Sequence, residues 1–259
     1  MAIAKSYQFT NIFKDELRNV IYSNEHLENR KDIEDIWRRV TESLCKQKYS
    51  TINKKLFETV KKYYLPIESE YYNKRFDLVV NIETIPENPG FLKITEEIEA
   101  DITSEEADTF DYTYSAFIPR SSSDDITDYN LKEFSMNDAK LDFERDNLLS
   151  KVVSEESVSV KFSYKCERKL NDYRVKRTEE KIICLSHNPY RIHRATWMFK
   201  SFKVTINYPK SLDIRFIDLG VLGKWNVTKD EINGLNRIRA NYNALMFKNQ
   251  GFMVTLKEV

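Results

Sequence analysis

The stretch VSVKFSYKC, residues 158–166, places an apolar or aromatic residue at every second position, with polar residues between them. This alternation predicts a β-strand with one face in a core and the other in water. Similar runs occur at 76–82, 92–102, 110–118, 173–185, 196–208 and 212–219. Strands with one wet face are typical of antiparallel sheets. We therefore expect a large, mostly antiparallel β sandwich or barrel of about eight to ten strands.

The first quarter of the chain shows a helical period instead. Apolar residues recur at helical spacing in the three segments 9–21, 33–44 and 52–63. The predicted domains are therefore a helical N-terminal region, 1–70, and a β-rich domain, 71–259.

A single late helix is also expected within the β-rich domain. Thr228 and Glu231 have the spacing of a capping box. Ile232, Leu235 and Ile238 follow at helical spacing. The predicted fold class is therefore α+β, with N-terminal helices, a large antiparallel β sandwich or barrel and one late helix.

Composition excludes disorder over most of the chain, because aromatic residues make up 13% and disordered segments lack them. No run reaches the ~18 apolar residues that a membrane-spanning helix needs. The first residues do not resemble a secretion signal, so a cytoplasmic location without a membrane is expected. Cys45, Cys166 and Cys184 are then expected to be reduced thiols.

The net charge is zero, but the charges are unevenly distributed along the chain. Residues 66–157 carry 8 Lys and Arg against 23 Asp and Glu, whereas residues 158–259 carry 20 against 9. Opposite charges of this size favour contact between the two parts, because each alone would repel itself. The alternative is that the basic part binds an anion.

Most motifs of large enzyme classes are missing from the sequence. Five glycines supply neither GxGxxG nor a Walker loop. Cys184, His187 and His193 lack a nearby fourth ligand for structural zinc. Asp172, Glu179 and Lys181 resemble the acidic-x-lysine pattern of metal-dependent nucleases, which leaves a nuclease as an alternative. No catalytic residue, metal or cofactor is predicted.

The strongest candidate site is a run of basic residues interleaved with aromatic ones. Cations suit phosphate and aromatic rings stack on bases, so this run predicts a site for a phosphate-bearing ligand. Arg174 and Lys176 are the preferred pair, because Val175 between them marks the opposite strand face as buried. The full candidate set is Arg168, Tyr173, Arg174, Lys176, Arg177 and Trp197. A charged strand rim that pairs with the acidic segment is the alternative.

The end of the chain, YNALMFKNQGFMV at 242–254, predicts a closing β-hairpin. This stretch resembles the ending of β-rich sensor domains in bacterial anti-phage signalling effectors. The resemblance implies a barrel that recognises a cyclic nucleotide, although those effectors carry two transmembrane helices that this sequence lacks.

The expected function is therefore a non-enzymatic sensor or binding module for a nucleotide or cyclic oligonucleotide, with a role in prokaryotic antiviral defence. A nuclease and a protein-interaction scaffold without a small ligand are the alternatives. A protein partner or a homo-oligomer is compatible with either binding role.

Overall fold

The computed structural model describes residues 32–48, 51–52, 55–56, 58–60, 70–104, 109–122, 124–167 and 171–259. The chain divides into two compact units, 1–65 and 66–259. In the first unit, α3 (Ile33–Lys48) corresponds to the second of the three predicted helices. The helix predicted at 9–21 lies outside the described residues, and part of 55–60 is helical.

The predicted α+β class is wrong, because the protein is mostly β and its described helices are few and short. The second unit contains only strands and their connections among its described residues. The helical periodicity of the first quarter therefore describes a small part of the molecule and does not define its class.

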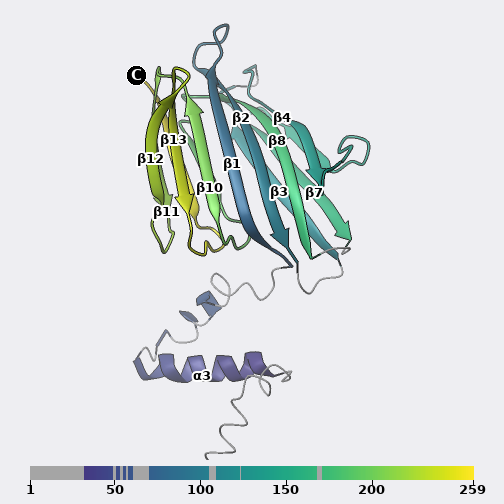
Figure 1. Cartoon of the computed structure of the whole chain (residues 1–259), viewed down its shortest axis with the longest axis vertical. Helices are drawn as coiled ribbons and strands as arrows, with labels where there is room; N and C mark the ends of the chain where they lie inside the picture. The colour runs from purple at the N-terminus through teal and green to yellow at the C-terminus, as the bar shows by residue number, and fades with distance from the viewer. Residues whose placement is uncertain are drawn as a thin grey trace, which may run out of the picture. The chain divides into compact units, whose positions relative to one another are not determined.

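An eight-stranded sheet forms one layer of the second unit, in the order β12-β13-β10-β1-β2-β8-β4-β5 (Figure 1). All its pairings are antiparallel except that of β1 with β10. Its strands are β1 (Tyr72–Thr84), β2 (Phe91–Thr103), β4 (Asp128–Met136), β5 (Ala139–Lys140), β8 (Asp172–Cys184), β10 (Phe202–Tyr208), β12 (Asn226–Ile232) and β13 (Leu235–Tyr242).

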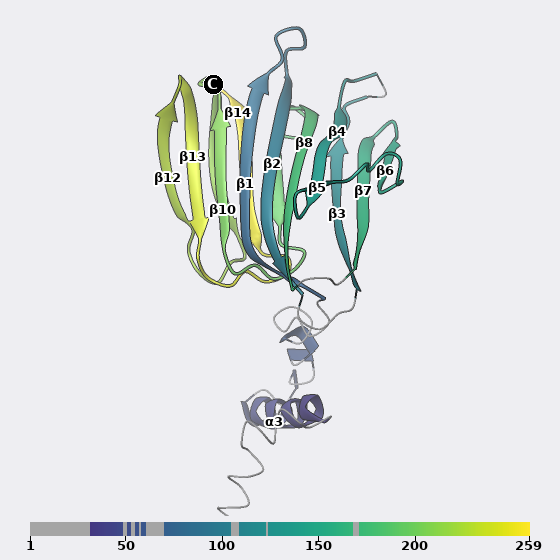
Figure 2. The ribbon, with the colours of Figure 1, turned by 45° about the vertical axis from the view of Figure 1, so that its right-hand side comes forward.

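Two three-stranded sheets lie on one side of this large sheet (Figure 2). The first has the order β3-β7-β6 and the second the order β11-β14-β9. Their strands are β3 (Thr109–Pro119), β6 (Leu149–Val153), β7 (Ser157–Glu167), β9 (Tyr190–Arg194), β11 (Leu212–Leu219) and β14 (Gly251–Glu258). The layers form a β sandwich whose second layer is split into two parts.

One hydrophobic core connects the layers, and it is built from the alternating residues that the sequence identified. In β7, Val158, Val160, Phe162 and Cys166 are buried while the residues between them are more exposed. Burial of this apolar surface supplies the main free energy of folding. No described helix is long and apolar enough to cross a membrane.

The prediction of a late helix is wrong, because the residues from Thr228 to Ile238 belong to the hairpin of β12 and β13. Asn233 and Gly234 connect the strands with φ angles of 51° and 80°. Two consecutive positive φ angles are typical of a type I′ turn, and Asn-Gly is the preferred sequence for it. This local turn preference overrides the helical spacing of the flanking apolar residues.

The predicted closing hairpin is also wrong. β14 pairs with β11 and β9, and Met246 makes only an isolated bridge with Phe199. Gly251 explains part of this choice, because a Cβ at this position would lie 2.0 Å from the carbonyl oxygen of His193 in β9. Glycine thus permits the close approach of β14 to β9.

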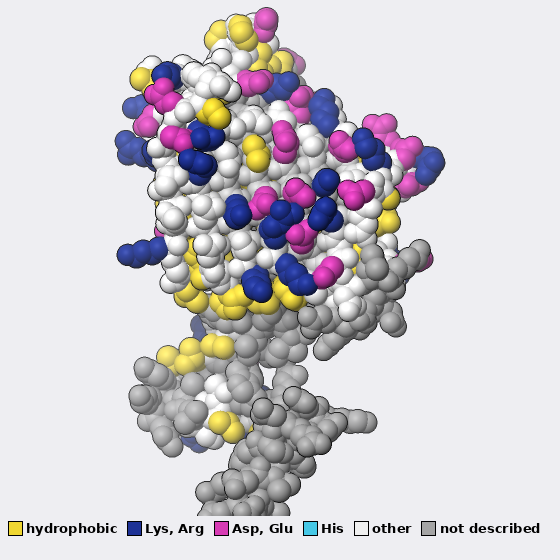
Figure 3. Space-filling model, in the orientation of Figure 1, with side chains coloured by type: hydrophobic (Ala, Val, Ile, Leu, Met, Phe, Trp, Pro, Cys, Tyr) yellow, Lys and Arg dark blue, Asp and Glu magenta, His cyan; other side chains and the backbone are white. Residues whose placement is uncertain are grey.

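The acidic and basic parts of the chain do contact each other, as predicted, because β2 of the acidic part pairs along its length with β8 of the basic part. On the outer face of the large sheet, Asp101 is opposite Arg174 and Glu99 is opposite Lys176. The space-filling view of this face shows cations and carboxylates intermingled (Figure 3). Cross-strand pairs of this kind stabilise a sheet modestly.

Candidate functional site

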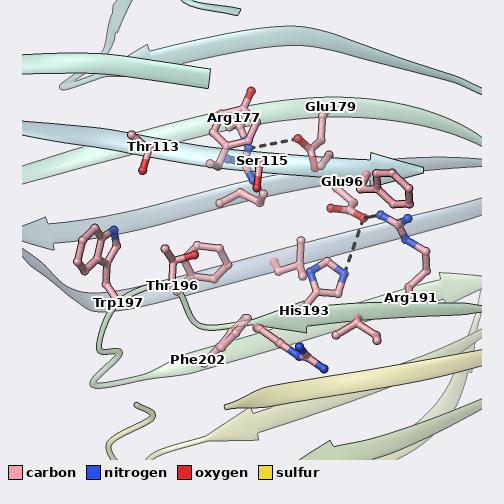
Figure 4. A pocket seen from close by; sticks show the side chains of 18 of the residues that line it. Glu96, Thr113, Ser115, Arg177, Glu179, Arg191, His193, Thr196, Trp197 and Phe202 are labelled. Atoms are coloured by element: carbon pink, nitrogen blue, oxygen red, sulfur yellow. Dashed lines mark hydrogen bonds and ion pairs between the residues drawn. The ribbon is translucent and has the colours of Figure 1, made fainter. Parts of the chain in front are cut away.

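A pocket of about 410 Å³ lies at the split in the second layer. Its floor comes from β1, β2 and β8 of the large sheet, and its walls come from β3 and β9. Residues 196–199, which follow β9, line one end (Figure 4). This volume is within the range of small-ligand sites.

Two buried carboxylates and a buried lysine form the centre of the floor. Lys181 Nζ is 2.7 Å from Glu96 Oε2 and also bonds Glu179 Oε1. All three side chains are at most 4% exposed. They point inward because the odd-numbered residues of β8 face the interior, in register with Glu96 on β2.

Tyr129 of β4 forms a hydrogen bond with the carboxylate of Glu179. Its hydroxyl donates to Glu179 Oε2 at 2.6 Å. Burial, followed by the nearby Glu179 charge, raises the pKa of Tyr129 far above its ordinary value. The phenol therefore keeps its proton and acts as a donor at all physiological pH values.

Two arginines extend the charged cluster toward the cavity. Arg177 Nε lies 3.4 Å from Glu179 Oε2, and its guanidinium carbon is 3.6 Å from the centre of the Tyr114 ring. Arg191 Nη2 is 3.5 Å from Glu96 Oε1. The Nε atoms of both arginines are buried without a hydrogen-bond partner among the described residues. A buried donor without a partner is costly unless a ligand or water satisfies it.

His193 of β9 completes the cluster, with Nε2 at 3.8 Å from Glu96 Oε1. Burial lowers the pKa of His193 to about 4, although Glu96 opposes this shift. The imidazole is therefore neutral at pH 7. Burial acts to raise the pKa of Glu96, but the neighbouring cations, Lys181 first, outweigh it and hold that pKa well below its ordinary value.

The cluster consequently carries an excess of one positive charge at neutral pH. Its cations are Arg177, Lys181 and Arg191, and its carboxylates are Glu96 and Glu179. Arg194 also lines the pocket, whereas no other described carboxylate does. An excess charge in a low-dielectric site attracts an anion much more strongly than the same charge in water. The arrangement thus favours a negatively charged group.

Aromatic side chains form the other end of the pocket. Tyr71 and Trp197 lie with ring centres 5.2 Å apart, and Phe76 packs edge-on against Phe199 and Phe202. All five line the cavity. The pocket therefore joins a cationic part to an aromatic part, which suits a ligand with an anionic group and an apolar or ring-shaped portion.

The structure separates the residues predicted for this role. Arg177 and Trp197 line the pocket. Arg174 and Lys176 lie on the outer face of β8, half exposed and paired with carboxylates. Tyr173 packs in the core against Phe110, and Arg168 lies outside the described residues. The alternation argument correctly placed Arg177 opposite the other two, but the buried face carries the pocket.

The residues proposed for a nuclease do not share a site. Asp172 lies at the exposed start of β8, where it pairs with Lys74, whereas Glu179 is seven residues further along the strand. That separation is about 23 Å at the usual rise of a strand. Within the described part of the chain, no group of three or more His, Cys, Asp or Glu side chains is placed to hold a metal ion.

Sequence reasoning left Arg191 out of the candidate set, considered His193 only as a zinc ligand, and gave Glu96 no role. A signal was present for Glu96, since this carboxylate interrupts the apolar alternation of its strand. A charged residue at an inward position is costly and therefore informative. Arg191 and His193 lie on β9, a five-residue strand that the sequence did not predict.

Comparison with known proteins adds no family assignment to this site. No protein-family model matches the sequence, and no curated protein matches it. Solved structures with partial similarity include a candidate protease from Parabacteroides distasonis, with 9% identity and a TM-score of 0.45, which covers 73% of this chain and 40% of that one.

Two other solved structures are similar to this chain at a comparable level. An M1 zinc metallopeptidase from Deinococcus radiodurans has 11% identity and a TM-score of 0.35, covering 72% of this chain and 42% of that chain. A candidate nutrient-binding protein from Legionella pneumophila has 6% identity and a TM-score of 0.39, covering 72% and 67%. This chain thus spans less than half the length of the two peptidase-like structures, and scores this low carry no argument about function.

Proposed function

We propose that this protein is a non-enzymatic binding module whose interior pocket takes up the anionic group of an organic ligand. The observation that supports it best is the buried excess of positive charge, together with the Arg191 Nε atom, which is buried without a hydrogen-bond partner among the described residues. Arginine suits this role because its planar fork donates parallel hydrogen bonds to phosphate or carboxylate oxygens.

The aromatic end of the pocket would hold the remainder of the ligand. Trp197 and Tyr71 offer flat surfaces beside the cationic part. Phosphate-bearing ligands with a ring, such as nucleotides and cyclic oligonucleotides, match this combination. Their binding, and a role in antiviral sensing, are the specific form of the proposal.

The test measures ligand-induced thermal shifts with AMP, a cyclic dinucleotide, inorganic phosphate and benzoate as probes. A ligand that binds only the folded state raises its apparent stability. We expect at least one anionic probe to bind the wild-type protein. Arg191→Gln should weaken that binding about tenfold or more, because a charge-assisted hydrogen bond is lost.

Arg174→Gln is the matched control, since it removes the same charge from an exposed residue of the large sheet. It should leave binding unchanged. The proposal fails if none of the probes binds at millimolar concentration, or if Arg174→Gln weakens binding as much as Arg191→Gln.

A further inference from the structure

The pocket lies between two strand edges that lack a partner on that side. In the described part of the chain, β9 is an edge strand of β11-β14-β9 and β3 is an edge strand of β3-β7-β6. Both edges line the pocket over the same floor (Figure 4). The second layer of the sandwich is thus interrupted where a strand would continue it.

The hydrogen bonds around β9 show which of its backbone groups face the gap. Ala195 N donates to Gln250 O, and Leu256 N donates to Pro189 O, both at 2.7 Å. Odd-numbered residues therefore bond β14, and the backbone groups of Tyr190, Ile192 and Arg194 point to the opposite edge. These three residues line the pocket.

The same reasoning applies to β3. Arg120 N donates to Glu156 O on the side of β7, so even-numbered residues of this strand face β7. Asp111 N donates instead to the Glu70 carboxylate, away from β7. The backbone groups of Thr113, Ser115 and Phe117 consequently lie on the edge away from β7, and these residues also line the pocket. The Thr113 backbone bonds the Tyr71 hydroxyl, so Ser115 and Phe117 offer the groups for a further strand.

Exposed apolar side chains flank the gap on its outer side. Phe117 of β3 is 65% exposed, while Tyr190 and Ile192 of β9 are 48% and 41% exposed. Proteins usually protect flat, apolar strand edges against pairing with other chains. Here two such edges face each other across a charged floor. Only a chain segment that fits between the two edges can therefore pair with both of them.

From these features we infer that the gap binds an extended peptide segment of a partner protein, which adds a strand between β9 and β3. Free backbone groups on both edges would pair with the peptide, as in recognition by strand addition. The five residues of β9 limit the paired length to about 17 Å. This inference rests on the proposed function, because it assigns the anionic group of the ligand to a side chain of the peptide.

Charge complementarity predicts the chemical type of the peptide side chain that points into the pocket. Alternate residues of an inserted strand point into the pocket, where Arg177, Lys181 and Arg191 outnumber Glu96 and Glu179. One inward position should therefore hold an anionic side chain. The next inward position, two residues along, reaches the aromatic end at Trp197 and Phe202 and should be apolar.

The binding test uses an immobilised library of capped hexapeptides in which one position is fixed as Glu, phosphoserine or Gln. The Glu and phosphoserine arms distinguish the two sources of negative charge. We expect binding of peptides that contain an anionic residue and an apolar residue two positions apart, and we expect the Gln arm to be weaker by about tenfold or more.

Ile192→Pro tests whether the peptide pairs with the strand edge. This substitution removes one N–H that faces the gap and no bond to β14, so an edge strand tolerates it. It should weaken binding of the best peptide about tenfold or more. Ile192→Ala keeps the N–H and removes the same side chain, so Ile192→Pro should bind about tenfold or more weakly than Ile192→Ala.

N-methylation of single residues in the best peptide provides a readout that does not depend on folding of a variant. Methylation at any paired position should weaken binding strongly, because successive N–H groups of the inserted strand pair in turn with β9 and with β3. Equal binding of the Pro and Ala variants together with tolerance of every N-methyl group would overturn strand addition. Binding of AMP or phosphate without any hexapeptide would overturn this inference and leave the proposed function intact, and binding of neither class would overturn both.

Discussion

The two faces of β8 carry similar residues but have opposite roles. The outer face presents Arg174 and Lys176, half exposed and paired with carboxylates. The inner face presents Arg177, Glu179 and Lys181, at most 10% exposed. Exposed ion pairs contribute little because water screens them, whereas buried charges are costly unless each one is compensated. The same residue types thus form screened surface ion pairs on one face and line a candidate binding pocket on the other.

The largest difference between the faces should appear when one partner of a buried pair is removed. Lys181→Met leaves Glu96 and Glu179 without their shared cation. We expect the free energy of unfolding to fall by about 3–5 kcal/mol. Urea denaturation measures this change. Lys176→Met on the outer face is the control, with an expected change of about 1 kcal/mol or less; similar losses in both variants would contradict the comparison.

Acid should destabilise the inner face through His193. The folded pKa of about 4 lies below the ordinary value of 6.5, so the unfolded chain binds more protons in this window. The contribution is therefore fully present above pH 6.5 and is lost as the pH falls toward 4. Between pH 7 and pH 5 the free energy of unfolding should decrease by about 2 kcal/mol from this group.

His193→Gln should flatten this pH dependence, because glutamine does not titrate. Urea denaturation of both proteins at several pH values measures the slope. An equal pH slope of the free energy of unfolding in the wild type and the variant would contradict this prediction, because it would mean that His193 titrates alike in the folded and unfolded chain.

A double-mutant cycle can sharpen the account of the buried cluster. Glu96→Gln removes the carboxylate that Lys181→Met leaves without its cation. The double variant should be more stable than the sum of the two single changes predicts, by about 1–3 kcal/mol. Strict additivity in urea denaturation would mean that the two side chains are not coupled.

The smallest effect is expected on the outer face. Arg174→Ala removes a half-exposed guanidinium that lies 3.6 Å from Asp101. The free energy of unfolding should change by about 1 kcal/mol or less. Ligand binding in the thermal-shift assay should stay as in the wild type; a large loss of stability would show that the outer ladder is more than a screened surface network.

Local patterns predicted individual strands well and the late elements poorly. Alternation identified β1, β2, β3, β7, β8 and β11, because a strand with one buried face repeats every two residues. It failed around Ile232 and Leu235, where apolar spacing fits a helix but Asn233-Gly234 closes a hairpin. The turn signal was the stronger one, since both residues adopt the positive φ that the connection requires.

The candidate site could be predicted only in part. Arg177 and Trp197 were among the predicted residues, and Glu96 was visible as a charge on an apolar face. Arg191 and His193 lie on a strand of five residues, which is too short for its alternation to stand out in the sequence. Their relation to Glu96 joins β9 to β2 across nearly one hundred residues of sequence.

The sequence by itself determined the β-rich nature of the second unit and which β8 side chains share a face, because both follow from a two-residue period along one strand. Only the tertiary structure decided which charges are buried together and where the second layer is interrupted. The physical reason is that burial and strand pairing depend on segments distant in the chain. A charged residue on a strand has the same local pattern whether a neighbouring layer covers it or water does.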